Sequence, residues 1–187
     1  TAPSAPDVKR PRLWIDRAFA AVGAGSIVTG TLTGGKLRVD DELTLSPGDL
    51  KARIRGIQTQ GQKRTKIGPG HRVALNLAGI DHHHLSRGVA LINDEKWHRT
   101  IRIDAELTVL KNLGHDVSRR GAYAIYIGSG EWAVKLRFLG PNELAPGMTE
   151  NVRIFLPSKL SLMPGDRFIL REFGRDETVG GGTILDV

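Results

Sequence analysis

The sequence offers few groups of residues whose types and spacing would support catalysis. Its 187 residues include no cysteine, which removes disulfides, thiolate metal sites and cysteine nucleophiles. No Gly-x-x-x-x-Gly-Lys-Ser/Thr sequence is present, so the phosphate loop of the P-loop nucleotidases is missing. Paired carboxylates and a Ser-His-Asp order do not stand out either. We therefore expect a chain that is not an enzyme on its own.

The strongest metal-like signal is the run His82 to His84. Metal sites usually take ligands that are spaced along the chain, often with carboxylates, and Asp81 is the only close carboxylate here. We expect this run to form a loop between strands and predict no metal site.

Two glycine-rich segments, Gly23–Gly25 and Gly180–Gly182, could suggest a dinucleotide site. Such a site needs a helix directly after the glycines, whereas strand-like residues follow both segments. We therefore interpret the glycines as points of close backbone approach, or bulges, in a barrel.

Positive charge is the other chemical feature of the sequence. Lys and Arg number 27 against 20 Asp and Glu, a formal net charge of +7. This excess favours a polyanion such as nucleic acid, although a soluble basic domain without such a partner would look similar. No apolar run approaches the roughly 18 residues of a membrane span, so no membrane partner is expected. Six basic residues surround one expected hairpin: Lys51, Arg53, Arg55, Lys63, Arg64 and Lys66.

Short alternating segments separated by turns must position these residues. The clearest strand runs from Ile101 to Val109, and Pro-Gly turns precede several others. No window predicts an amphipathic helix of ten or more residues, so the pattern predicts an all-β fold of sandwiches or barrels. In the first strand, strict alternation places Leu13, Ile15, Arg17 and Phe19 on one face. A core position for that face would require a pocket or a partner for Arg17.

Specific motifs at both ends of the chain resemble one protein family. Near the start, residues 15–19 precede the segment Gly-Ala-Gly-Ser-Ile-Val-Thr-Gly. Near the end lie two further segments, Gly-Asp-Arg-Phe-Ile-Leu-Arg-Glu and Val-Gly-Gly-Gly-Thr-Ile-Leu-Asp. These segments resemble the second and third domains of the elongation factor Tu class of translational GTPases. The Asp16-Arg17 pair and Arg72 resemble the residues of the selenocysteine-specific branch of this class. The resemblance covers about residues 12–187.

The resemblance implies two antiparallel β-barrels in tandem. We expect a linker at 1–10, a barrel of the domain II type at 11–94 and one of the domain III type at 95–187. In the family, GTP and Mg²⁺ bind an amino-terminal domain, and carboxyl-terminal winged helices read an mRNA hairpin. Neither of these parts is expected in this chain, which needs no cofactor of its own. The implied location is the cytoplasm.

The resemblance also implies a tRNA-binding role. The implied partners are selenocysteinyl-tRNA, the ribosome, and the absent GTPase and winged-helix domains. Domain II of the family holds the 3′ end of the tRNA and helps to form the amino-acid pocket, where a selenolate anion must be told from neutral serine. Arg17 and Arg72 are the implied cationic walls, because a guanidinium is a fixed positive donor. Asp16 would orient one of them or bind the α-amino group, and Phe19 could stack on the terminal adenine.

Domain III of the family meets the acceptor and T arms of the tRNA. Four arginines are the implied contacts to its backbone: Arg119, Arg120, Arg171 and Arg175. Three alternatives stay open at this point. Arg17 could form a surface ion pair with Asp16, the chain could be the equivalent module of elongation factor Tu or initiation factor 2 gamma, or it could be an interaction module without any RNA role.

Overall fold

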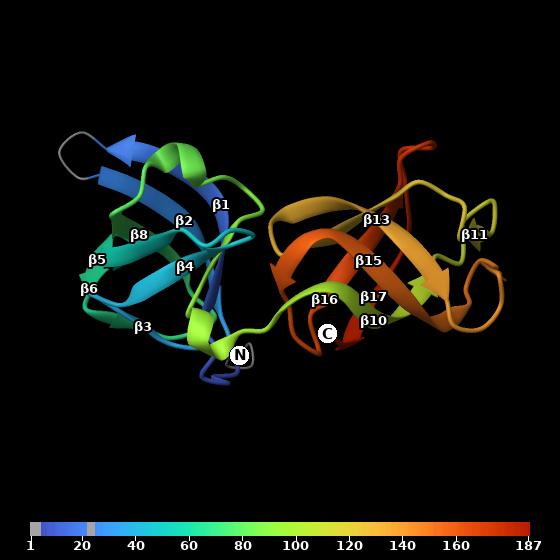
Figure 1. Cartoon of the computed structure of the whole chain (residues 1–187), viewed down its shortest axis with the longest axis horizontal. Helices are drawn as coiled ribbons and strands as arrows, with labels where there is room; N and C mark the ends of the chain where they lie inside the picture. Colours follow the sequence, from blue (N-terminus) through green and yellow to red (C-terminus); the bar gives the residue numbers. More distant parts are fainter. Residues whose placement is uncertain (1–4, 22–24) are drawn as a thin grey trace. The chain divides into compact units, whose positions relative to one another are not determined.

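Short antiparallel strands build two separate units, Thr1–Trp97 and His98–Val187 (Figure 1). The computed structural model describes residues 5–21 and 25–187. Within these ranges the only helices are two three-residue 3-10 turns, His82–His84 and Asp94–Lys96. Neither is long and apolar enough to cross a lipid bilayer. The all-β prediction is confirmed.

The first unit has nine strands, of which β4, β9, β1, β2, β8 and β5 close into a barrel. Its strands are β1 (Arg12–Ala21), β2 (Gly25–Thr33), β3 (Leu37–Arg38), β4 (Glu42–Ser46), β5 (Lys51–Thr59), β6 (Gln62–Arg64), β7 (Lys66–Ile67), β8 (Arg72–Ala78) and β9 (Ala90–Ile92). The main sheet has the order β4-β9-β1-β2-β8-β5-β6, and pairing of β4 with β5 closes the ring. The short strands β3 and β7 pair separately.

Alternation along β2 and β8 separates the core of this barrel from its outer surface. Val28 and Leu32 of β2 point inward, as do Val73 and Leu75 of β8, and each is at most 2 % exposed. Burying an aliphatic side chain of this size stabilises the fold by roughly 1.5–3 kcal/mol. The residues between them are therefore held on the outer face by the packing of their neighbours.

The predicted common face of Leu13, Ile15, Arg17 and Phe19 is wrong. The register between β1 and β2 shifts between Ile15, which pairs with Gly30, and Arg17, which pairs with Thr29. The extra residue is Asp16, which makes this a β-bulge. Leu13 and Ile15 are fully buried, whereas Arg17 and Phe19 are exposed. The bulge turns Arg17 out of the core, so its charge needs no buried partner.

Trp97 belongs to the first unit, whereas the sequence predicts the second barrel to begin at residue 95. Its indole Nε1 donates a hydrogen bond to the carbonyl of Pro11 at 3.2 Å. The guanidinium of the buried Arg12 lies 4.8 Å from the centre of the Trp97 ring and 5.2 Å from that of Trp14. These contacts tie the end of the unit to its first strand and explain why Trp97 is only 7 % exposed.

The second unit is a closed barrel with the strand order β10-β15-β13-β12-β16-β17. The strands of this unit are β10 (Arg99–Val109), β11 (Val117–Ser118), β12 (Tyr123–Ile127), β13 (Gly130–Phe138), β14 (Glu143–Leu144), β15 (Thr149–Ser161), β16 (Arg167–Glu172) and β17 (Glu177–Asp186). Strands β11 and β14 form a separate pair. The prediction of two antiparallel β-barrels in tandem is confirmed.

The glycines of β17 allow close approach of two neighbouring strands. A Cβ on Gly182 would overlap the carbonyl oxygen of Glu106 in β10, and a Cβ on Gly180 would overlap that of Thr108. These positions therefore serve the packing of the barrel. Of the other glycine segment, Gly23 and Ala24 lie outside the described residues.

Candidate functional site

Asp16 connects three strands on the outer face of the first barrel. Its Oδ2 lies 2.5 Å from Nη1 of Arg72, the first residue of β8. Its Oδ1 accepts a hydrogen bond from the hydroxyl of Thr29 on β2, also at 2.5 Å. The bulge in β1 places Asp16 over β2, where it can reach both partners. One carboxylate thus fixes the guanidinium of Arg72, whose side chain is 61 % exposed.

Arg17 lies on the same outer face as this pair. It is paired with Thr29 across the strands and is exposed. The structure describes no ion-pair partner for Arg17 within residues 5–21 and 25–187, so Asp16 is paired with Arg72 instead. The structure therefore joins Asp16 directly to Arg72, and Arg17 lies on the same outer face, opposite Thr29 of β2.

This cluster of three residues carries one uncompensated positive charge. The carboxylate of Asp16 balances the guanidinium of Arg72, and Arg17 adds a second guanidinium without a second carboxylate. Guanidinium groups stay protonated at any physiological pH and present several donors in a fixed plane. The arrangement is suited to a ligand with a single negative charge.

A hollow of about 490 Å³ lies on the same side of the sheet, over strands β2, β8, β5 and β6. Ile27, Ala74 and Asn76 form part of its lining. Phe19 is paired opposite Ile27 and is 46 % exposed, so an apolar surface borders the hollow. The Oδ1 atom of Asn76 is buried and accepts no hydrogen bond from the described residues.

The sequence did not reveal the polar lining of this hollow. Asn76 and Gln58 alternate with apolar residues in ordinary strands, and nothing in their spacing marks them. A second bulge, between Ile54 and Gly56 in β5, adds Arg55 to the lining. Bulges are irregularities of pairing, so strict alternation of apolar and polar residues cannot locate them.

The four arginines predicted in the second unit lie near one another. Arg119 and Arg120 are exposed in the turn after β11. The carbonyl of Ala122, at the end of this turn, accepts a hydrogen bond from the backbone of Phe173 in the β16–β17 hairpin, at 2.8 Å. In that hairpin, Nη2 of Arg171 lies 2.7 Å from Oδ1 of Asp176 and Nη1 of Arg175 lies 3.1 Å from Oε2 of Glu172. Phe173 itself is 51 % exposed in the same hairpin.

Among residues 5–21 and 25–187, two groups of side chains have donor atoms close enough for a metal ion. Asp81, His82 and His83 form an exposed group in which Asp81 accepts a hydrogen bond from the backbone of His83 at 2.9 Å. His115, Glu172 and Glu177 form the other group. In both groups, hydrogen bonds and ion pairs among the residues themselves explain why the donor atoms lie close together. Neither group gives further evidence of a bound metal ion.

His115 balances two carboxylates that oppose each other in the hairpin. Glu172 and Glu177 are paired across β16 and β17. Nε2 of His115 lies 2.7 Å from Oε1 of Glu177 and 3.5 Å from Oε2 of Glu172. Hydrogen bonds to the carbonyl of Asp116 and to Glu177 raise the pKa of His115 above its ordinary value. The protonated imidazole therefore reduces the repulsion between the two glutamates.

Comparison with known proteins finds relatives of the same kind that match almost the whole chain. The selenocysteine-specific elongation factor of Desulfomicrobium baculatum is 34% identical over 175 residues, 94% of this chain and 28% of that protein. That of Escherichia coli is 38% identical over 175 residues, 93% of this chain and 26% of that protein. The chain thus spans little more than a quarter of these two relatives. No protein-family profile matches it.

A solved structure agrees with the fold. The translation elongation factor SelB from Methanococcus maripaludis, in its apo form, superimposes with a TM-score of 0.81 and 21% identity, over 100% of this chain and 44% of that one. The two barrels of this chain therefore share their fold with part of that factor. In sequence, the chain is a homologue of the selenocysteine-specific elongation factors over about a quarter of their length.

Proposed function

We propose that this chain is the part of a selenocysteine-specific translation elongation factor that binds selenocysteinyl-tRNA for delivery to the ribosome. The observation that carries the proposal is the grouping of Asp16, Arg17 and Arg72 on one outer face, next to a hollow. The first barrel would hold the aminoacyl 3′ end and select the selenolate. The second would hold the acceptor and T arms of the tRNA.

The charge of the cluster supports selection of selenium over oxygen. A selenol is much more acidic than a hydroxyl, so selenocysteine is largely an anion at neutral pH whereas serine is neutral. The net single positive charge of the cluster would be balanced by the selenolate. Serine in the same place would leave Arg17 without a counter-charge, and such an unpaired group disfavours the wrong ligand.

The spacing along β8 supports a terminal nucleoside in the hollow. Arg72, Ala74 and Asn76 occupy successive outward positions, about 7 Å apart. An amino acid esterified to the ribose of the last nucleotide would reach Arg72 while the base lies against Ala74 and Ile27. Phe19 would stack on the adenine.

Both oxygens of Asp16 are engaged, one by Arg72 and one by Thr29. This favours a role in orienting Arg72 over binding of the α-amino group. In the second barrel, Arg119, Arg120, Arg171 and Arg175 would contact phosphates, which gives affinity and salt dependence without reading sequence. GTP with Mg²⁺, and the mRNA hairpin, would bind other domains of a longer cytoplasmic protein.

The test is binding of the 187-residue chain to selenocysteinyl-, cysteinyl- and seryl-tRNA, measured as protection of the ester bond from hydrolysis. The proposal expects the selenocysteinyl form to be bound most tightly and the seryl form least. A module of the elongation factor Tu type, or an interaction module without an RNA role, would show no such order. Equal affinity for all three would reject the proposal.

A further inference from the structure

The second barrel exposes an aromatic ring beside a break in its strand pairing. Arg102 of β10 pairs with Phe155 of β15, but two residues earlier Thr100 pairs with Leu160, so the register shifts between these pairs. Ile101 lies at this break and is 53 % exposed. Phe155 is 39 % exposed, although an aromatic side chain in a barrel usually belongs to the core. The break therefore leaves two large apolar side chains uncovered.

Cations lie on both sides of Phe155. This residue pairs with Arg102 on β10 and with Lys135 on β13, and paired residues of neighbouring strands have their Cβ atoms about 5 Å apart. Arg137, the next outward residue of β13, adds a third positive charge. All three basic residues are exposed. We call Ile101, Arg102, Lys135, Arg137 and Phe155 together the Phe155 face.

A carboxylate beside these cations is already engaged. Asp104, the next outward residue of β10 after Arg102, accepts two hydrogen bonds of 2.6 and 2.7 Å from the guanidinium of Arg153. These hydrogen bonds lower the pKa of the Asp104 carboxyl, and the charge of Arg102 lowers it further. In the part of the chain that the structure describes, the side chains of Arg102, Lys135 and Arg137 form no ion pair. The Phe155 face therefore carries three positive charges that no ion pair neutralises.

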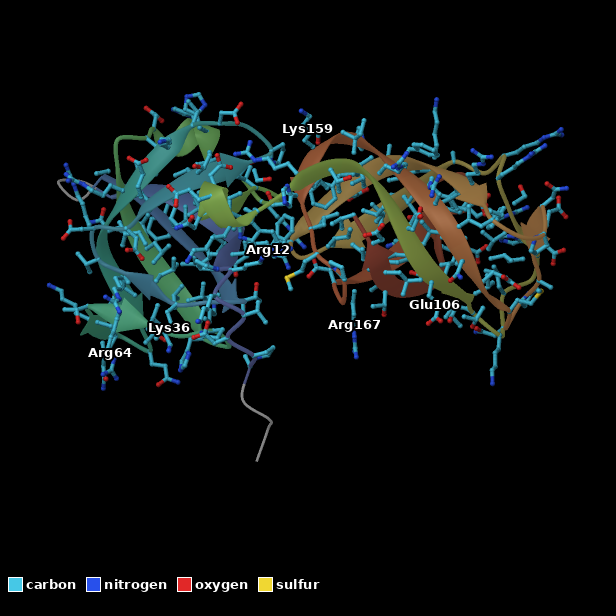
Figure 2. The ribbon with its side chains drawn as sticks, turned by 60° about the horizontal axis from the view of Figure 1, so that its bottom comes forward. Arg12, Lys36, Arg64, Glu106, Lys159 and Arg167 are labelled. Carbon is cyan, nitrogen blue, oxygen red and sulfur yellow. The ribbon has the colours of Figure 1, made fainter. Side chains whose placement is uncertain are left out.

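The Phe155 face lies on the opposite side of the second barrel from the proposed tRNA contacts. The closed order β10-β15-β13-β12-β16-β17 places β15 three strands away from β16 in either direction. Arg171 and Arg175 belong to β16 and the hairpin after it, whereas Phe155 belongs to β15. Figure 2 shows Lys159 of β15 and Arg167 of β16 projecting from opposite sides of this barrel. A ligand on the Phe155 face would therefore not compete with tRNA on the β16–β17 hairpin.

The composition of the Phe155 face indicates the chemical class of its ligand. Proteins bind single-stranded nucleic acid by stacking unpaired bases on exposed aromatic rings, while cations follow the phosphates. A double helix hides the faces of its bases and is recognised by shape and backbone instead. A closed barrel has no free strand edge, so an extended peptide cannot add a strand to it. A ring between two cations therefore fits one unpaired base together with its neighbouring phosphates.

We propose that the Phe155 face binds a short unpaired segment of RNA, with one base stacked on Phe155. Arg102 and Lys135 lie two strands apart, about 10 Å, so their side chains can reach the phosphates before and after the stacked nucleotide. Arg137 would contact a further phosphate, and Ile101 would pack against the ribose. The choice of RNA over DNA rests on the proposed function, whereas the argument from stacking and charge does not.

The role of the ring is tested by fluorescence anisotropy of a labelled oligouridine of about eight nucleotides with the 187-residue chain. Phe155→Leu keeps an apolar side chain but removes the ring, so the affinity should fall roughly five- to a hundredfold. Its salt dependence should stay that of the parent, because no charge is lost. Phe155→Tyr keeps the ring and should change the affinity less than about twofold. Binding of an RNA duplex of the same length should respond to neither variant.

Charge variants give a second, independent signature. Arg102→Gln and Lys135→Gln should each lower the slope of log K against log salt by about 0.7, and the double variant by about 1.4. Lys111→Gln is the matched control, because it removes the same charge at an exposed residue beyond the other end of β10. Its slope should equal that of the parent. The substituted side chains are exposed, so the Tm should change by less than about 2 °C in each variant.

Three results would overturn the proposal. The first is a folded Phe155→Leu chain that binds the oligouridine as tightly as the parent does. The second is an equal loss of binding in Lys111→Gln and Arg102→Gln. The third is tighter binding of a polyglutamate peptide of the same length than of the oligouridine, which would assign the Phe155 face to an acidic protein. The oligouridine carries no aminoacyl end, so failure here and failure of the proposed function are distinguishable.

Discussion

Asp16 on β1 holds Arg72 on β8, with Oδ2 and Nη1 2.5 Å apart, although β2 lies between their strands. The contact exists because a bulge adds one residue to β1 and brings the carboxylate over β2. The same carboxylate accepts a hydrogen bond from the hydroxyl of Thr29. A local irregularity of the first strand thus sets the direction of a guanidinium two strands away, and no carboxylate in the described part of the chain pairs with Arg17.

Asp16→Asn tests the orienting role. The amide cannot form the ion pair, so Arg72 loses its fixed direction while both guanidinium groups remain. We expect the preference for selenocysteinyl- over seryl-tRNA to fall roughly fivefold, equivalent to about 1 kcal/mol. The free energy of unfolding should fall by less than about 1 kcal/mol, because the pair is largely exposed. An unchanged preference, measured by ester protection, would show that Asp16 does not orient Arg72 for binding.

The glycines of β17 predict a sharp difference between two Gly→Ala substitutions. Gly182→Ala drives a methyl group into the carbonyl of Glu106, so the strands must separate. We expect a loss of about 3 kcal/mol in the free energy of unfolding, measured with urea. Gly174→Ala, in the β16–β17 turn, has open space around the added methyl and serves as the control. Equal stability of both variants would contradict the close approach of β10 and β17.

His115 makes the stability of the second barrel depend on pH. Because its pKa is raised in the folded state, its contribution is complete below the ordinary value of 6.5 and is lost as the pH rises through the raised value. The difference in unfolding free energy between the parent and His115→Gln should therefore be largest near pH 5.5 and shrink towards pH 8.5. A difference that grows with pH would show that the neutral imidazole is the stabilising form.

Regular periodicity explains which parts of the fold were predictable. The alternation predicted for Ile101–Val109 holds from Ile103 onward, where the inward residues are buried, whereas Ile101 lies at a register shift and is exposed. The bulges at Asp16 and Arg55 break that periodicity, and the exposed position of Arg17 and the lining of the hollow depend on them. The grouping of Asp16, Arg17 and Arg72 was implied by resemblance alone. The pairing of β2 with β8 joins residues that are far apart in the sequence, so their spacing could not indicate that they are neighbours.

The basic residues show the same limit. The sequence groups Lys51 and Lys66 around one hairpin, whereas Lys51 pairs with Glu42 at 2.7 Å and Lys66 faces Arg38. Charge counting finds an excess of cations but not which of them remain without a counter-charge. That depends on cross-strand register, which the closure of the barrel sets.

The central claim is that Arg17 and Arg72 recognise the selenolate. The most direct measurement compares the affinity of the chain for selenocysteinyl-tRNA with that for seryl-tRNA in the parent, in Arg17→Ala/Arg72→Ala, and in Lys135→Ala/Lys159→Ala, which removes equal charge elsewhere. We predict a preference of at least about a hundredfold in the parent and the control, and of less than about threefold in the double arginine variant. A double arginine variant that keeps the full preference would contradict the account.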